Sequence, residues 1–152
     1  MHLCCDLITR LSGKTLVTAE SCTGGGIGAA LTAVPGSSKV YKGGIISYTN
    51  AVKVKQLGVD PELLDRVGAV SALVAEAMAI GVRKSLDADV SVSVTGLAGP
   101  DGDDFGNPVG TVYIGYADSE TSFSREYHFS GDREAVRNQA IESALRLIVE
   151  SN

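Results

Sequence analysis

The chain has 152 residues, of which 44% are hydrophobic and 20% are charged, and this is enough for one globular domain with a substantial core. Its net charge of −5 argues against a basic nucleic-acid-binding surface. No apolar run approaches the roughly 20 residues of a membrane-spanning helix, and the first residues lack the features of a secretory signal peptide. We therefore expect a cytoplasmic protein that binds neither nucleic acid nor membrane.

The first half of the chain alternates helix-like segments with short β-branched runs. In chain order, these patterns predict a helix over 3–11, a strand over 15–19, a helix over 24–34 and a strand over 42–49. Pro35-Gly36 ends the second of these helices. Asn50 is the expected N-cap of a short helix that ends at Gly58.

The second half begins with helices and ends with strands and a long helix. Asp60 is the expected N-cap of a short helix with Pro61 at its first position, and Ser71 starts a helix that continues to about Leu86. Residues 90–95 alternate between valine and serine or threonine, which predicts a strand with one covered face. The remaining predicted elements are paired strands over 111–116 and 122–129 and a final helix from 131–133 to about 149.

The order of these elements is typical of an α/β protein. Helices separate the first strands, whereas the last three strands follow one another before the final helix. No repeat, low-complexity tract or linker divides the chain. The sequence therefore predicts a single three-layer α/β/α domain over residues 1–152, with a mixed β-sheet.

The most informative segment is Thr-Ala-Glu-Ser-Cys-Thr-Gly-Gly-Gly over residues 18–26, where the first strand meets the second helix. Free backbone N–H groups at a helix start favour an anion or a developing oxyanion. The carboxylate of Glu20, the hydroxyl of Ser21 and the thiol of Cys22 come together at this point. The segment indicates chemistry on an anionic or carbonyl-bearing small molecule.

Other motifs in the chain do not meet the requirements of the sites they resemble. Ser12-Gly13-Lys14-Thr15 ends like a phosphate-binding P-loop, but Ile8 stands where a glycine is required and a strand follows instead of a helix. The acidic loop over 101–104 lacks the glutamate that completes a calcium loop, so we interpret it as a solvated turn. We predict neither a metal site nor a cofactor.

The shortage of histidine directs attention to lysine as the base. His2 lies at the N-terminus and His128 lies in a predicted strand, so neither is a natural partner for a serine at a turn. Lys53 follows Tyr48 and Asn50 in the first turn after a strand end, where active-site residues of α/β sheets collect. The alternative for Lys53 is an ordinary solvated helix face.

The other candidate residues also have simpler interpretations. Ser21 is a possible helix N-cap, and Cys22 is either a thiolate nucleophile activated by the helix start or, as we favour, a packing residue. Arg133 either balances Asp132 or binds a phosphate in bidentate fashion. Ser38 either caps a turn or points its hydroxyl into a site.

Seven segments together closely resemble the C-terminal domain of the competence/damage-inducible protein CinA, whose stand-alone versions are nicotinamide mononucleotide amidohydrolases. Any one segment is weak evidence, but together they cover nearly the whole chain in the order and spacing of that family. The segments are Thr18-Ala19-Glu20-Ser21-Cys22-Thr23-Gly24-Gly25, Pro35-Gly36-Ser37-Ser38, Ser47-Tyr48-Thr49-Asn50-Ala51-Val52-Lys53, Gly68-Ala69-Val70-Ser71, Thr95-Gly96-Leu97-Ala98-Gly99-Pro100-Asp101-Gly102, Pro108-Val109-Gly110-Thr111-Val112 and Gly131-Asp132-Arg133.

The resemblance implies hydrolysis of the carboxamide of nicotinamide mononucleotide to nicotinate mononucleotide and ammonia, in pyridine nucleotide recycling, by serine-type chemistry without a metal. The match carries Ser21, Ser38, Tyr48, Lys53, Thr95 and Arg133 onto functional positions of the family. On that basis we hypothesise Ser21 as nucleophile, Lys53 as base and Tyr48 as the group that orients or relays the proton, with backbone N–H groups around 22–25 stabilising the oxyanion. The expected substrate-binding residues are Glu20, Gly24, Gly25, Ser38, Thr95 and Arg133. A rival assignment makes Ser38 the nucleophile and Ser21 a binding residue.

Two other functions stay open at the level of sequence. The domain is alternatively a non-catalytic module of the competence and DNA-damage response that contacts a recombination protein. A nucleotide-phosphate hydrolase is a further alternative and requires a divalent metal. The apolar strands and helix faces, together with the resemblance, predict a homo-oligomer, with a dimer as the first choice and a tetramer as the second.

Overall fold

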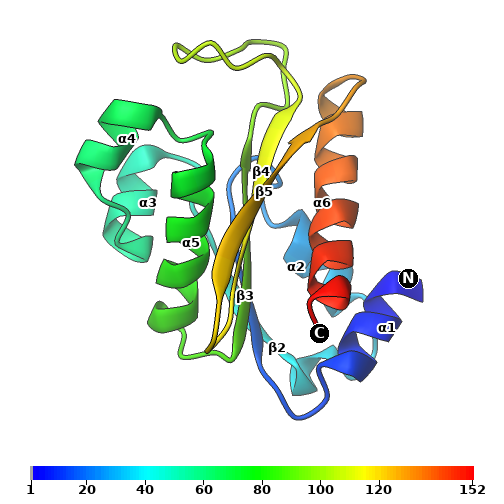
Figure 1. The fold of residues 1–152 in the computed structure, drawn as a ribbon. Coiled ribbons are helices and arrows are strands. Elements are labelled where there is room, and N and C mark those ends of the chain that lie inside the picture. The colour runs from blue at the N-terminus through cyan, green and yellow to red at the C-terminus, as the bar shows by residue number, and fades with distance from the viewer. Residues whose placement is uncertain (1) are drawn as a thin grey trace.

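The computed structural model describes residues 2–152 and contains a five-stranded mixed β-sheet between two layers of helices (Figure 1). The strand order is β2-β1-β3-β4-β5, with β1 parallel to both of its neighbours and the last two pairs antiparallel. The strands are β1 (Leu16–Glu20), β2 (Tyr41–Ile46), β3 (Val90–Gly96), β4 (Thr111–Ala117) and β5 (Ser122–His128). The predicted three-layer α/β/α architecture with a mixed sheet is confirmed.

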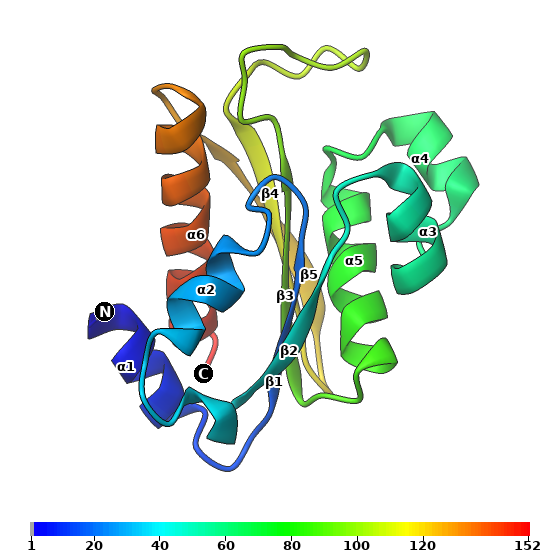
Figure 2. The ribbon, with the colours of Figure 1, turned by 180° about the vertical axis from the view of Figure 1, so that it is seen from behind.

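Helices cover both faces of the sheet, as the two opposite views in Figures 1 and 2 show. One face is covered by α1 (His2–Arg10), α2 (Gly26–Thr32) and α6 (Arg133–Glu150). The other face is covered by α3 (Asn50–Leu57), α4 (Pro61–Val67) and α5 (Ala72–Ser85). A buried hydrophobic cluster fills the space between the sheet and each helical layer. None of the helices within residues 2–152 is long and apolar enough to cross a membrane.

The strand β3 is buried on both faces, so the predicted single covered face is wrong. Its valines enter the cluster beneath α6, as an alternating strand predicts. Its serines lie beneath α5, where Ser91 and Ser93 donate hydrogen bonds to the carbonyl oxygens of Ala79 and Ala75. The hydroxyls are therefore satisfied by the helix backbone, and polar residues on this face are compatible with close packing.

Most predicted helix starts agree with the structure, with two differences near the site. Asp60, Ser71 and Asp132 are N-caps whose side chains accept backbone N–H bonds, as expected. Thr49 is the N-cap of α3, and Asn50 is the first helical residue rather than the cap. The second difference is that β2 ends at Ile46, three residues before the predicted end, so residues 47–49 form a connection instead of a strand.

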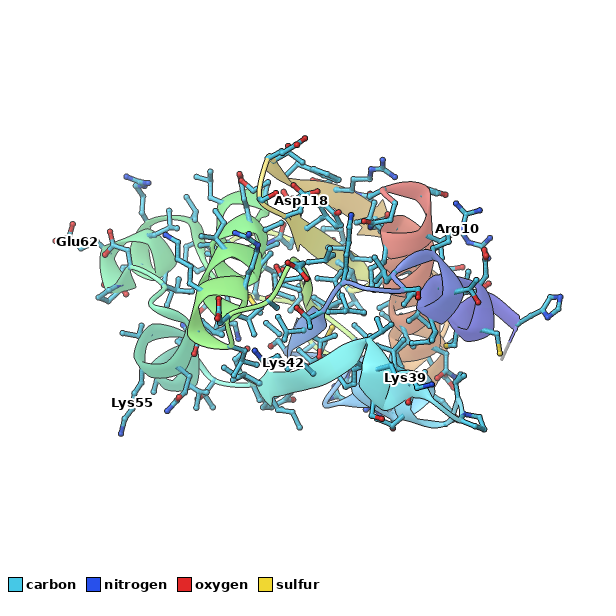
Figure 3. All side chains as sticks on the ribbon, turned by 90° about the horizontal axis from the view of Figure 1, so that it is seen from below. Arg10, Lys39, Lys42, Lys55, Glu62 and Asp118 are labelled. Atoms are coloured by element: carbon cyan, nitrogen blue, oxygen red, sulfur yellow. The ribbon has the colours of Figure 1, made fainter. Side chains whose placement is uncertain are left out.

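The two ends of the sheet carry different groups. The carboxyl ends of the parallel strands β1, β2 and β3 lie at the upper end in Figure 1, together with the start of α6 and the long connection over 97–110. The opposite end, seen from below in Figure 3, carries Lys39 and Lys42. Ser38 lies beside Lys39 in the 3₁₀ turn Ser37–Lys39, which precedes β2. In α/β folds the carboxyl ends of the strands are where ligands usually bind.

Candidate active site

A cavity of about 360 Å³ opens at the carboxyl ends of β1 and β3. Five segments form its wall: the turn after β1, the β2–α3 connection with the first turn of α3, the α4–α5 connection, the end of β3 with the β3–β4 connection, and the start of α6. The lining residues are Ser21, Cys22, Tyr48, Asn50, Lys53, Ala69, Val70, Thr95, Gly96, Leu97, Ala98, Gly99, Pro100, Asp101 and Arg133. A larger open depression of about 900 Å³ lies against α1 and α6, and neither Ser21 nor Lys53 lines it.

Ser21 and Lys53 form a hydrogen-bonded pair in the wall of this cavity. Lys53 Nζ lies 3.0 Å from Ser21 Oγ and also donates to the carbonyl oxygens of Ser47 at 2.6 Å and Tyr48 at 3.5 Å. The lysine is only 1% exposed, and none of the ion pairs within residues 2–152 includes it. Burial lowers the pKa of Lys53 from 10.5 to about 8. At a pKa of about 8, roughly a tenth of the amine is neutral at pH 7, and this neutral form is able to accept the serine proton.

A tight turn after β1 presents Ser21 to the lysine. The Ser21 N–H donates to Val94 O of the adjacent strand, and Ser21 O accepts from the Gly24 N–H at 3.1 Å. Gly24 and Gly25 have φ values of 59° and 99°, which glycine adopts without strain. Gly25, and not Ser21, is the N-cap of α2, so the interpretation of Ser21 as a helix cap is wrong.

The Glu20 carboxylate occupies the helix start that the sequence assigned to a bound anion. Glu20 is 2% exposed and accepts hydrogen bonds from Thr23 Oγ1 at 2.7 Å, Ile27 N at 2.8 Å and Gly28 N at 3.0 Å. The first N–H groups of α2 are therefore satisfied within the chain. Glu20, Gly24 and Gly25 do not line the cavity, and we correct their predicted substrate-binding role to a structural one.

Cys22 lies beside the serine as a buried thiol. Burial raises its pKa from 9.0 to about 11, so the group stays protonated at neutral pH. The alternative of a Cys22 thiolate nucleophile is not supported, whereas the interpretation of Cys22 as a packing residue agrees with its place in the hydrophobic cluster beneath α6.

Tyr48 and Arg133 meet on the outer side of the cavity. The Tyr48 hydroxyl accepts a hydrogen bond from Arg133 Nη2 at 3.2 Å, and Arg133 Nη1 donates to the carbonyl oxygen of Gly99. Only the main-chain oxygen of Tyr48 approaches Lys53 Nζ. The structure therefore places the Tyr48 side chain, which is 59% exposed, on the arginine and not on the Ser21–Lys53 pair. Asp132 caps α6 and forms no ion pair with Arg133.

The structure places Thr95 in the cavity wall and Ser38 away from the cavity. Thr95 lines the cavity from the end of β3, and its hydroxyl donates to Ala69 O at 2.9 Å. Ser38 is exposed in the turn before β2, at the opposite end of the sheet from Ser21. Within one subunit, Ser38 is not placed to attack or bind a molecule held at the Ser21–Lys53 pair.

Sequence reasoning missed three side chains at this site. Asn50 and Asp101 line the cavity, and both belong to segments that carry the family resemblance. Arg137 donates hydrogen bonds to the turn that carries Ser21. Its spacing of four residues from Arg133 puts both arginines on one face of α6, and this was the available signal.

The acidic loop is held together by hydrogen bonds to the Asp103 carboxylate. Asp103 accepts hydrogen bonds from Phe105 N and from both nitrogens of Asn107, and the Asn107 amide also donates to Val70 O at 3.1 Å. Within residues 2–152, no three histidine, cysteine or acidic side chains are grouped so as to hold a metal ion. A hydrogen bond therefore joins this loop, which lies between β3 and β4, to the segment just before α5. In Figure 2 the loop projects toward the side of α4.

Comparison with known proteins shows the family to which the chain is similar. The family model of the CinA C-terminal domain matches residues 4–151. The nicotinamide-nucleotide amidohydrolase PncC of Pseudomonas putida is 50% identical over 136 residues, which cover 90% of this chain and 85% of that protein. A CinA-like protein of Thermosynechococcus vestitus is 52% identical over 138 residues, or 89% of this chain. This chain spans only about a third of the length of that cyanobacterial relative, since the match covers 33% of it.

Solved structures of similar proteins have the same fold as this chain. A CinA superfamily protein from Escherichia coli superposes with a TM-score of 0.96 at 38% identity, covering 99% of this chain and 88% of that one. The competence/damage inducible protein CihA from Agrobacterium tumefaciens gives a TM-score of 0.94 at 37% identity, covering 98% and 93% of the two chains. Sequence, fold and family model thus agree, and the chain belongs to the CinA C-terminal domain family.

Proposed function

We propose that this protein hydrolyses the carboxamide of nicotinamide mononucleotide to nicotinate mononucleotide and ammonia. The observation that carries the proposal is the 3.0 Å contact between Ser21 Oγ and the buried Lys53 amine, at the wall of a cavity. A serine with a neutral lysine beside it is suited to acyl transfer from an amide. The name of the similar Pseudomonas putida amidohydrolase supports the same reaction.

In the proposed mechanism Ser21 Oγ attacks the amide carbon while Lys53 Nζ takes the hydroxyl proton. The oxyanion is stabilised by backbone N–H groups of the turn after Ser21, and donors of this kind contribute about 3 kcal/mol each. The protonated Lys53 then gives its proton to the leaving nitrogen, and ammonia departs. Water deprotonated by the same lysine attacks the acyl-serine and releases the carboxylate.

The charges at the cavity support a substrate with separated charges. Nicotinamide mononucleotide carries a positive pyridinium ring and a negative phosphate. Arg133 uses two of its five N–H donors on Gly99 O and the Tyr48 hydroxyl, so three stay available for the phosphate. Asp101 lines the same cavity and supplies a negative charge for the ring. The volume of about 360 Å³ lies near the lower end of ligand sites, which favours a mononucleotide over a dinucleotide.

Ammonia release from nicotinamide mononucleotide by the purified protein tests this function. We expect Ser21→Ala to lower kcat by at least about 10³-fold, because the attacking oxygen is lost. Ser38→Ala is the matched control, since this exposed serine lies outside the cavity, and we expect near-normal turnover.

Near-normal turnover by Ser21→Ala would overturn the nucleophile assignment, and a loss confined to Ser38→Ala would favour the rival serine. If the wild-type protein releases no ammonia across a pH series, the non-catalytic competence module becomes the better interpretation. We also propose that the protein acts as a cytoplasmic homo-oligomer, and the exposed apolar side chains of Ile46, Leu73 and Phe105 support association.

A further inference from the structure

Arg137 of α6 connects the final helix to the turn that carries Ser21. Its Nε donates to Cys22 O at 3.0 Å and its Nη2 donates to Thr23 O at 3.2 Å. The side chain is half-buried, and none of the ion pairs found within residues 2–152 involves it. One guanidinium therefore binds two consecutive carbonyl oxygens, a task for which its planar fork of donors is well suited.

These two bonds fix the orientation of the peptide groups after the serine. A peptide group is planar, so the direction of the Cys22 carbonyl also sets the direction of the Thr23 N–H. The Thr23 carbonyl has a second donor in the Gly26 N–H, whereas within the described chain the Cys22 carbonyl accepts only from Arg137. The orientation of the Cys22–Thr23 peptide group thus depends on this arginine.

The same turn contains an N–H group that is free to bind a substrate. The Ser21 N–H donates to Val94 O and the Gly24 N–H donates to Ser21 O, but those of Cys22 and Thr23 have no acceptor within residues 2–152. Buried N–H groups without a partner are rare in folded proteins, and such groups at a nucleophile are typical oxyanion donors. Cys22 lines the cavity directly beside Ser21, whereas Thr23 is fully buried and does not line it, so the Cys22 N–H is the donor available to a substrate.

We propose that Arg137 is a positioning residue that holds this turn so that the Cys22 N–H is preorganised for the oxyanion formed when Ser21 attacks. The inference rests on the proposed function, because it assigns Arg137 a part in the same acyl transfer. Arg137 does not line the cavity and makes no contact with the substrate; it acts through the backbone of Cys22 and Thr23. Its uncompensated positive charge also favours negative charge in the turn.

The test compares nicotinamide mononucleotide with its thioamide analogue, using ammonia release for both. Sulfur accepts hydrogen bonds weakly, so the thioamide gains less from correctly oriented N–H groups. We expect Arg137→Ala to lower kcat about 30- to 100-fold on the amide, with KM changed less than about threefold, and to lower kcat less than about fivefold on the thioamide. Arg137→Lys, with one hydrogen bond restored, should lie between wild type and Arg137→Ala on the amide.

Two controls keep the result independent of folding. The ratio of amide to thioamide rates is measured on one preparation, so a reduced folded fraction lowers both rates equally and leaves the ratio unchanged. Arg146→Ala removes an exposed arginine of the same helix, which pairs with Glu142, and should behave as wild type. Equal losses on both substrates, or an unchanged kcat on the amide, would overturn the role of Arg137 alone. An inactive wild-type protein would overturn the proposed function and this inference together.

Discussion

Two buried ionisable side chains lie close to the end of β1, and they have opposite surroundings. Glu20 is surrounded by donors, two of them backbone N–H groups at the start of α2. Among residues 2–152, the hydrogen-bond partners of Lys53 are neutral oxygens, those of Ser21, Ser47 and Tyr48. A buried charge with matching partners stabilises the fold, whereas a buried cation without an anion favours its neutral form. Glu20 and Lys53 are thus buried to the same degree, but Glu20 has a structural role and Lys53 is the reactive group.

The free energy involved at Lys53 is a large fraction of the stability of a small domain. A pKa lowered from 10.5 to about 8 means that the charged amine is about 3 kcal/mol less favourable in the folded chain than in water. Domains are typically stable by only about 5–15 kcal/mol. A buried lysine with this cost is expected where it takes part in catalysis. The comparison of Lys53 with Glu20 therefore yields tests that separate activity from stability.

The largest expected effect is the loss of turnover on replacing the lysine. Lys53→Met keeps the apolar stem and removes the amine, so Ser21 loses its base, and we expect kcat to fall about 10³-fold. Ammonia release measures the effect. Lys55→Met is the matched control, because Lys55 lies on the same helix but is exposed and projects outward (Figure 3). A Lys53→Met variant that keeps a tenth of wild-type turnover would show that the base is elsewhere.

The second prediction concerns the pH dependence of wild-type turnover. Only neutral Lys53 accepts the proton, so kcat should rise with pH and level off above about 8, the pKa of Lys53. Steady-state rates between pH 6 and 10, corrected for enzyme stability, give the midpoint. A midpoint near 10.5, the value of an ordinary lysine, would show that Lys53 is solvated or paired when the enzyme works.

The third prediction is that the two buried groups have opposite effects on stability. At pH 7 Lys53→Met should raise the free energy of unfolding by up to about 3 kcal/mol. Glu20→Gln should lower it by about 1–3 kcal/mol, because the new amide donor faces backbone donors. Urea unfolding measures both.

The pH dependence of the free energy of unfolding gives a further check on the cost of burying Lys53. Below pH 8 both folded and unfolded chains hold the charge, and wild type bears the full penalty. Between about 8 and 10.5 the folded amine is neutral while the unfolded one is charged, so wild-type stability rises with pH and the advantage of Lys53→Met disappears. If Lys53→Met and Glu20→Gln changed the free energy of unfolding in the same direction, the contrast between the two buried groups would be contradicted.

The sequence predicted the architecture and the central pair because both depend on local signals. Hydrophobic periodicity and capping residues placed nearly every element. The rule that active-site residues follow strand ends made Lys53 a candidate partner of Ser21, and the family resemblance selected it over a solvated helix face. The order of the strands was not predictable, because it depends on contacts between segments distant in the chain.

Side-chain direction was the part that sequence reasoning missed. The helix start was assigned to a bound anion and Glu20 to the substrate, but the chain turns back so that the Glu20 carboxylate itself occupies the helix start. Ser38 was assigned to the site by family resemblance, yet β2 places it at the other end of the sheet. In both cases the residue type was informative and only the tertiary structure showed which group it serves.

Tyr48 gives the smallest expected effect and the sharpest test of side-chain direction. Its hydroxyl binds Arg133, which lies 85 positions away in the sequence, and not Lys53. Tyr48→Phe removes one hydrogen bond from the arginine, so we expect KM to rise about two- to fivefold, which corresponds to about 0.5–1 kcal/mol. The value of kcat and the midpoint of its pH dependence should stay at the wild-type values, because the Ser21–Lys53 contact is intact.

Arg133→Ala is the matched comparison for Tyr48→Phe, and we expect a larger increase in KM because the phosphate ligand itself is lost. Steady-state kinetics of both variants across pH separate the two possible roles of the tyrosine. A fall in kcat or a shifted pH midpoint in Tyr48→Phe would place the hydroxyl on the proton path, as the family resemblance implies. Tyr48 would then have to leave Arg133 and turn toward Lys53 when substrate binds, and the division between a phosphate side and a proton-transfer side would no longer hold.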